Sequence, residues 1–163
     1  MTMMNCLRCS IVALMLTPAM GAAQDFDAGV AAYNAGDYVT AVQEWRPLAE
    51  QGDASAQSNL GWMYANGHGV AQDHAEAAMW YLLAAEQGNA TAQFNLGGKY
   101  RFGQGVAQDF TTAHMWYNIA AAQGEELAGV MRDIVADLMT AQAISEAQRR
   151  ARVCMGSAYR NCD

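Results

Sequence analysis

Three histidines are the side chains of this sequence best suited to metal binding or proton transfer. His68 and His74 flank Asp73, which brings two imidazoles and a carboxylate into one short segment, a ligand set that suits zinc. A near copy of this segment later in the chain keeps the aspartate, as Asp109, but has no histidine at either place. The segment therefore does not depend on them, and we predict a helix cap with two solvent-facing rings, no metal and no cofactor. The third ring, His114, is expected on the surface of a helix.

The other reactive side chains form no catalytic pattern. The Gly-x-Gly pairs that begin at Gly67 and Gly103 follow predicted helices, whereas a phosphate-binding loop follows a strand. No serine lies in a nucleophile elbow. The adjacent Glu125 and Glu126 are explained by the favourable interaction of acidic residues with a helix N-terminus. We therefore predict no catalytic residues and a protein that is not an enzyme.

The composition narrows the choice of partners. The 163 residues suffice for one domain. The formal net charge is -7 and the pI about 4.8, so nucleic acid is not an expected partner, because phosphate binding needs a basic surface. Hydrophobic residues make up 53% of the chain and many of them are alanine, which indicates closely packed helices.

Residues 1–23 are typical of a secretory signal peptide. Arg8 precedes a short apolar run at residues 11–16, and small residues end the segment at Ala23. The run is too short to span a bilayer stably, and no later stretch is long and apolar enough to anchor the mature chain. The pattern predicts cleavage near Ala23, a periplasmic or secreted protein, and no integral membrane segment in the mature chain.

The four cysteines divide between the two ends of the chain. Cys6 and Cys9 fall within the predicted signal peptide, which leaves Cys154 and Cys162. An even number of cysteines in an oxidising compartment favours a disulfide between them. Two free thiols are the alternative.

Two consecutive stretches, residues 53–88 and 89–124, are nearly the same sequence repeated with a shift of 36 residues. In each, apolar residues recur at the spacing of one helical face, up to a Gly-x-Gly turn and then again up to a final glycine. Asp73 and Asp109 stand where the second helix of each stretch begins and are predicted N-caps. A fixed period of this length is typical of stacked helix pairs.

Gly61 and Gly97 lie in the middle of predicted helices, where glycine costs about 1 kcal/mol relative to alanine. Such a cost is recovered where a neighbouring helix approaches closely. We therefore expect each glycine to face a small residue of that neighbour, Ala77 or Ala113.

The repeats are preceded and followed by less regular units. Residues 26–52 predict a shorter pair of helices, and residues 125–163 predict two more helices that cap the stack. The first of these carries an apolar stripe of Leu127, Met131, Ile134, Val135, Leu138 and Met139. Residues 24–163 are thus predicted to form one all-α domain, an α/α superhelix of antiparallel helix pairs with a C-terminal capping helix.

Over residues 53–124 the repeated phrase A-x-x-N-L-G-x-x-Y-x-x-G-x-G-V-x-x-D-x-x-x-A-x-x-W-Y-x-x-A-A-x-x-G resembles the Sel-one-like repeat, a relative of the tetratricopeptide repeat. Residues 26–52 resemble a tetratricopeptide repeat. The resemblance implies an α/α solenoid that acts as an adaptor or assembly scaffold for a protein or peptide. Exported bacterial members are often tied to envelope or secretion complexes, and the family has no common catalytic residues.

In the related repeat the first helix of each pair lines a concave groove. This resemblance implies a partner-binding face, and the residues expected to line or border it are Ser58, Asn59, Trp62, Phe94, Asn95, Arg101 and Phe102. Trp62 has Gly98 as its counterpart, so packing of the repeat does not require it, and an exposed tryptophan is a good anchor. Asn59 and Asn95 recur in both repeats. They either hold the backbone of a bound peptide or satisfy polar groups between helices.

A cysteine-rich branch of the family supplies the alternative function. Its members carry paired cysteines seven residues apart at each repeat junction and are associated with β-lactam binding or hydrolysis. Cys154 and Cys162 also enclose seven residues, although here the pair occurs once and outside the two clear repeats. This resemblance supports a disulfide at a helix corner. The alternative function is a hydrolase that acts on β-lactams or cell-wall material.

Overall fold

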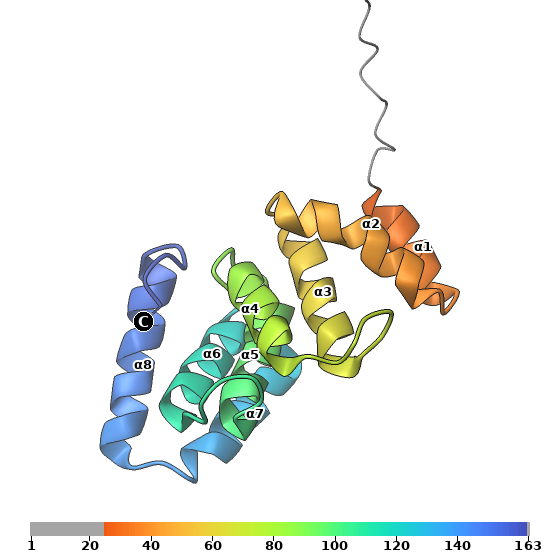
Figure 1. Cartoon of the computed structure of the whole chain (residues 1–163). Coiled ribbons are helices and arrows are strands. Elements are labelled where there is room, and N and C mark those ends of the chain that lie inside the picture. The colour runs from red at the N-terminus through yellow and green to blue at the C-terminus, as the bar shows by residue number, and fades with distance from the viewer. Residues whose placement is uncertain (1–24, 163) are drawn as a thin grey trace, which may run out of the picture.

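A computed structural model describes residues 25–162, which form eight α-helices and no strand (Figure 1). The helices are α1 (Phe26–Asn34), α2 (Tyr38–Glu50), α3 (Ala54–Asn66), α4 (His74–Ala85), α5 (Ala90–Phe102), α6 (Phe110–Ala122), α7 (Glu126–Ala136) and α8 (Ala141–Gly156). None of them has the length and apolarity needed to cross a bilayer. The predicted signal peptide, residues 1–23, lies outside the described residues.

Consecutive helices pack against one another from α1 to α7, as the predicted α/α solenoid requires (Figure 1). The first helices of successive pairs, α3, α5 and α7, each begin 36 residues after the one before. The period of the two clear repeats therefore extends into a third unit, although its sequence no longer resembles them. The final helix departs from the pattern, because α8 packs against α6 and makes at most marginal contact with α7.

The ends of the repeat helices are fixed by their own side chains. Asp73 and Asp109 are the predicted N-caps, and each carboxylate accepts hydrogen bonds from two backbone N–H groups of the first turn that follows. Gly67 and Gly103 end α3 and α5 in the left-handed conformation, with φ of 69° and 65°. These caps give both repeats the same turn between their two helices.

The mid-helix glycines admit a tyrosine ring rather than an alanine surface. A Cβ added at Gly61 would lie 2.7 Å from Cδ1 of Tyr81, and one added at Gly97 would lie 2.8 Å from Cδ1 of Tyr117. The expectation that Ala77 or Ala113 opposes these glycines is therefore wrong in detail. The close approach is real, but the aromatic ring of the following helix fills the space.

His114 is buried, with 2% of its surface exposed, so its predicted surface position is wrong. The reason is that α6 is covered by three helices, α5, α7 and α8, and almost no side of it faces solvent. Burial lowers the pKa of His114, because an imidazolium is poorly solvated there, and the nearby Arg132 lowers it further.

The apolar stripe predicted for the cap is half covered, since Met131 and Met139 are partly buried against the cluster that includes Val135. Val135 is fully buried, whereas Leu127, Ile134 and Leu138 are exposed to 56%, 39% and 60%. A second helix laid against α7 would cover them, but α8 lies on α6 instead. Val130, which the stripe did not include, is also 53% exposed on this surface.

The C-terminal segment is fastened at two points. A disulfide joins Cys154, in the last turn of α8, to Cys162, as the pairing of cysteines predicted. The ring of Tyr159 lies against Gly88 in the turn between α4 and α5, where an added Cβ would be 2.9 Å from it. The segment that follows α8 is thus held both to the end of α8 and to the turn between α4 and α5.

Replacing Gly61 by alanine tests the interlock. The new Cβ would collide with the Tyr81 ring, so Gly61→Ala should lower the free energy of unfolding by about 1–3 kcal/mol. Gly129→Ala is the matched control, because Gly129 lies inside α7 and an added Cβ would meet nothing within 4 Å beyond its chain neighbours and the backbone of its own helix. It should raise stability by up to about 1 kcal/mol. Urea denaturation of both variants measures the difference, and equal effects would contradict the interlock.

Candidate functional site

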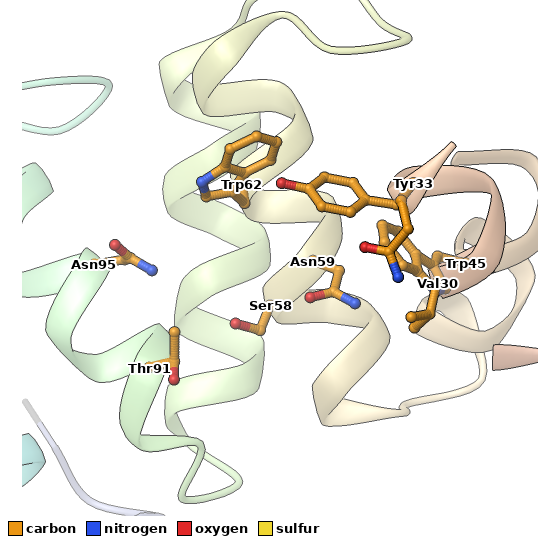
Figure 2. Close-up of a pocket in the computed structure, with 9 residues that line it drawn as sticks. Val30, Tyr33, Trp45, Ser58, Asn59, Trp62, Thr91 and Asn95 are labelled. Atoms are coloured by element: carbon orange, nitrogen blue, oxygen red, sulfur yellow. The ribbon is translucent and has the colours of Figure 1, made fainter. Parts of the chain in front are cut away.

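The concave side of the stack carries two adjoining hollows. The first, of about 370 Å³, lies between α1, α2, α3 and α5 (Figure 2). The second, of about 710 Å³, lies over α3, α5 and the start of α4, and reaches α6 and α7. Trp62 and Asn95 line both hollows. We call the two hollows together the groove.

The seven residues predicted for a partner-binding face all line the groove. Those in the first hollow are Ser58, Asn59, Trp62 and Asn95, and those in the second are Trp62, Phe94, Asn95, Arg101 and Phe102. They differ in accessibility, since Ser58 is almost buried whereas Phe102 is 61% exposed. The structure brings the predicted residues together. Their binding of a partner stays a prediction.

Two buried glutamines carry out the structural role that had been considered for the asparagines. The side-chain amides of Gln57 and Gln93 donate to the carbonyl oxygens of Ala49 and Ala85, in the preceding helix, at 3.0 Å. Gln87 in turn donates to the side-chain oxygen of Gln57 at 2.7 Å. Sequence reasoning missed these glutamines, although their recurrence at the same place in both repeats was a usable signal.

The amides of Asn59 and Asn95 remain available. Within residues 25–162 neither side chain makes a hydrogen bond, and both lie at the wall of the first hollow (Figure 2). Because the glutamines already satisfy the groups between helices, the repeated asparagines are not needed for that purpose. Each amide offers one acceptor and two donors to whatever occupies the groove.

An aromatic cluster holds Trp62 in place. Its ring meets Tyr33 of α1 edge-on, with centroids 5.4 Å apart (Figure 2), and His68 in the same manner at 4.8 Å. His68 also stacks on Tyr38, at 4.4 Å and 9° between planes. The predicted solvent-facing position of His68 is therefore wrong, because its ring is sandwiched between α2 and α3. Tyr33 is a groove residue that sequence reasoning did not identify, and His68, which lines neither hollow, supports the Trp62 ring.

The second hollow contains a buried cation that the sequence analysis did not single out. Lys99 is only 7% exposed, and its ammonium lies 3.3 Å from Nδ1 of His74 and 3.3 Å from Oε1 of Gln104, to which it donates. Burial lowers the pKa of Lys99, because the ammonium form loses solvation. His74 is thus a partner of Lys99 rather than a free surface ring.

Arg101 borders the same hollow and is held by uncharged groups. Its guanidinium carbon lies 4.8 Å from the centroid of the Phe102 ring, and Nη1 lies 3.2 Å from Sδ of Met131. Burial raises the pKa of Tyr117, and the positive charge of Arg101, together with a hydrogen bond to it, opposes part of that rise. These contacts fix the side chain along the groove without neutralising it.

The side chains that line the groove are not arranged as a nucleophilic catalytic site or a metal site would be. Ser58 lines the first hollow without a histidine, lysine or carboxylate beside it there. No carboxylate lines either hollow, and no three His, Cys, Asp or Glu side chains of the described residues converge as a metal site would need. The groove instead combines aromatic rings, free amides and two cations, a set suited to recognising another polypeptide.

Helix pairs stacked around a concave, partly apolar groove define the chain as an α/α-solenoid protein. The Sel1 repeat model, that of the Sel-one-like repeat, matches residues 54–89 and 90–125, one residue later at each boundary than the sequence analysis placed them. The chain belongs to the Sel1 repeat family, whose repeats generally mediate protein–protein interactions.

Two solved structures place the chain within this family. A Sel1 repeat protein from Oxalobacter formigenes is 39% identical, with a TM-score of 0.61 over 66% of this chain and 84% of that one. A protective antigen of uropathogenic Escherichia coli with an SLR fold is 31% identical, with a TM-score of 0.75 over 80% of this chain. This chain spans 30% of the length of that antigen. A comparison with curated proteins finds no match.

The variant Lys99→Met tests the free-energy cost of burying Lys99, because it introduces the residue type that the first repeat has at the equivalent position, Met63. Removing a buried charge should raise the free energy of unfolding at pH 7 by about 1–3 kcal/mol. The pKa of Lys99 is lower in the folded protein than in the unfolded chain. The destabilisation by the buried ammonium is therefore complete below the folded-state pKa, shrinks as the pH rises through that pKa, and is absent above the ordinary lysine pKa of 10.5.

Urea denaturation between pH 7 and 10.5 measures this dependence. The advantage of Lys99→Met over the unmodified protein should shrink across that range. The control variant Arg152→Met, at an exposed position, should change the free energy of unfolding by no more than about 0.5 kcal/mol at every pH. An advantage that does not change with pH would show that the charge is not its source.

Proposed function

We propose that this protein is an exported scaffold that binds one short segment of a partner protein in its groove. The observation that carries the proposal is the pair of unpaired amides, Asn59 and Asn95, which flank Trp62 at the junction of the two hollows. A side-chain amide matches the alternating donors and acceptors of an extended peptide backbone. Buried aromatic anchors commonly supply most of the binding energy in such contacts.

The dimensions of the groove favour a small ligand segment. Hollows of about 370 and 710 Å³ accept a few side chains, not a folded domain. The aromatic cluster of Tyr33, Trp62 and His68 is built before any partner arrives, so binding would order few groups of the scaffold. The partner segment is therefore expected to be extended or a single helix.

Export of the protein rests on two independent observations. Residues 1–23 have the charge, apolar run and small-residue ending of a signal peptide. Cys154 and Cys162 form a disulfide, a bond that persists in oxidising compartments. We infer that the mature protein is periplasmic or secreted and meets its partner there.

The groove is tested by selecting peptides from a random 12-residue display library on the purified mature protein. The double variant Trp62→Ala/Asn95→Ala should weaken the selected peptides about tenfold or more in fluorescence anisotropy, because it removes the anchor and one amide. The matched control is Met79→Ala/Leu83→Ala on α4, whose side chains are 44% and 38% exposed and line neither hollow. Circular dichroism should show unchanged helical content in both. Selected peptides that bind the groove variant as tightly as the unmodified protein would show that binding occurs elsewhere.

Export is tested by expressing the full chain in a bacterium and sequencing the N-terminus of the protein recovered from the periplasm. Cleavage after Ala23 predicts Gln24 as the first residue. Ala23→Phe should block processing, because the cleavage site needs a small residue, and should leave the full-length form attached to the membrane. Recovery of the unprocessed chain from the cytoplasm of cells that carry the natural sequence would disprove export.

A further inference from the structure

The groove is basic although the protein is acidic. The chain has 16 acidic residues against nine lysines and arginines, yet no aspartate or glutamate lines either hollow. The charged side chains that do line the groove are Lys99 and Arg101, joined by the titratable ring of His74. Lys99 is also the only lysine in the sequence. A positive spot in an otherwise negative molecule selects for an anionic group in the ligand.

Lys99 occupies a position that the fold otherwise reserves for apolar residues. The equivalent residues in the units before and after it, Met63 and Val135, are fully buried. Burying an ammonium costs free energy unless a carboxylate pairs with it, and the side chains that Lys99 meets at hydrogen-bond distance are those of His74 and Gln104, neither of which is a carboxylate. No carboxylate of residues 25–162 forms an ion pair with Lys99 or with Arg101.

Arg101 supplies a second unpaired cation at the same hollow. Its counterpart in the first repeat is Ala65, so packing of the repeat does not require it. The Phe102 ring and the sulfur of Met131 hold its guanidinium in place before a ligand arrives. An arginine fixed in this way can form two parallel hydrogen bonds with one carboxylate.

We propose that the second hollow binds the side-chain carboxylate of an aspartate or glutamate in the partner segment, between Lys99 and Arg101. This inference rests on the proposed function and specifies the class of peptide that the groove accepts. The ligand carboxylate would complete the ion pairing that the chain itself leaves open. The contacts that hold both cations within the chain would then serve to position them.

The acid belongs to the interior of the bound segment, because apolar surface continues on both sides of the cations. On one side lie Tyr33 and Trp62 of the first hollow. On the other, Val130 and Ile134 of α7, together with Leu138 just after its end, are exposed and stand 36 residues after Phe94, Gly98 and Phe102 of α5. A segment that runs along α3, α5 and α7 therefore meets apolar, then basic, then apolar surface. Its expected pattern is an acidic residue flanked by apolar residues, not a free chain terminus.

The test uses the peptides selected from the 12-residue library. They should carry an aspartate or glutamate between apolar residues, and replacing that acid by asparagine or glutamine should weaken binding to the unmodified protein about tenfold. The same replacement should have little effect on binding to Lys99→Met, which is expected to be the more stable protein. Raising the salt concentration should weaken only the acidic peptides. The control Arg149→Met, at an exposed side chain of α8 that lines neither hollow, should behave as the unmodified protein.

Each contrary outcome identifies what has failed. Selected peptides that lose binding to Trp62→Ala/Asn95→Ala but are indifferent to loss of their acid would overturn this inference and leave the proposed function standing. Peptides indifferent to the groove variant would overturn the proposed function itself. Binding abolished by amidation of the peptide C-terminus, with the internal acid dispensable, would replace a side-chain carboxylate by a terminal one and so also overturn the inference.

Discussion

The interlock between a glycine of one helix and a tyrosine ring of the next sets the geometry of both repeats. Because Gly61 and Gly97 have no side chain, the rings of Tyr81 and Tyr117 lie directly against the backbone of α3 and α5. The two helices of each pair are thereby held at one distance and one rotation. Trp62 follows Gly61 in the sequence, so the rotation that seats the ring on one side of α3 also turns Trp62 toward the groove. The groove is a consequence of how the helices pack.

Positions at which the two repeats differ are not needed for this packing, and their side chains determine the chemistry of the groove. Trp62 stands opposite Gly98 in the repeat alignment, and the structure places it at the junction of the two hollows. Arg101 replaces Ala65 and brings a cation to the second hollow. The exchange of Met63 for Lys99 acts in the same direction, although Lys99 sits in a core position. The first repeat thus supplies an aromatic wall and the second a basic one.

Local features of the fold could be predicted because their causes lie close together in the sequence. Helix caps such as Asp73 and left-handed turns such as Gly67 depend on a few adjacent residues, and the 36-residue period shows how the units stack. The burial of His114 could not be predicted, since it depends on which helices pack around α6. Periodicity also cannot distinguish an apolar stripe that faces the core from one that faces solvent, which is why the exposure of Leu127 was missed. The helix face that lines the groove could be predicted from the sequence, whereas the contacts of Lys99 could be found only in the structure.

Folding alone explains neither the buried ammonium of Lys99 nor the exposed aliphatic surface of α7. A stable scaffold would place methionine or valine at the first site and polar residues at Val130 and Ile134. The two departures are opposite in chemistry, because one buries a charge and the other exposes aliphatic side chains. A general shift of the composition toward polar or toward apolar residues therefore does not account for both. Both departures lie, however, on the helices α5 and α7, along which the proposed partner segment would run. A free-energy cost that is concentrated along one track is expected where a ligand recovers it on binding. In the proposed function, the specificity of this protein therefore depends on the track as a whole rather than on any single residue.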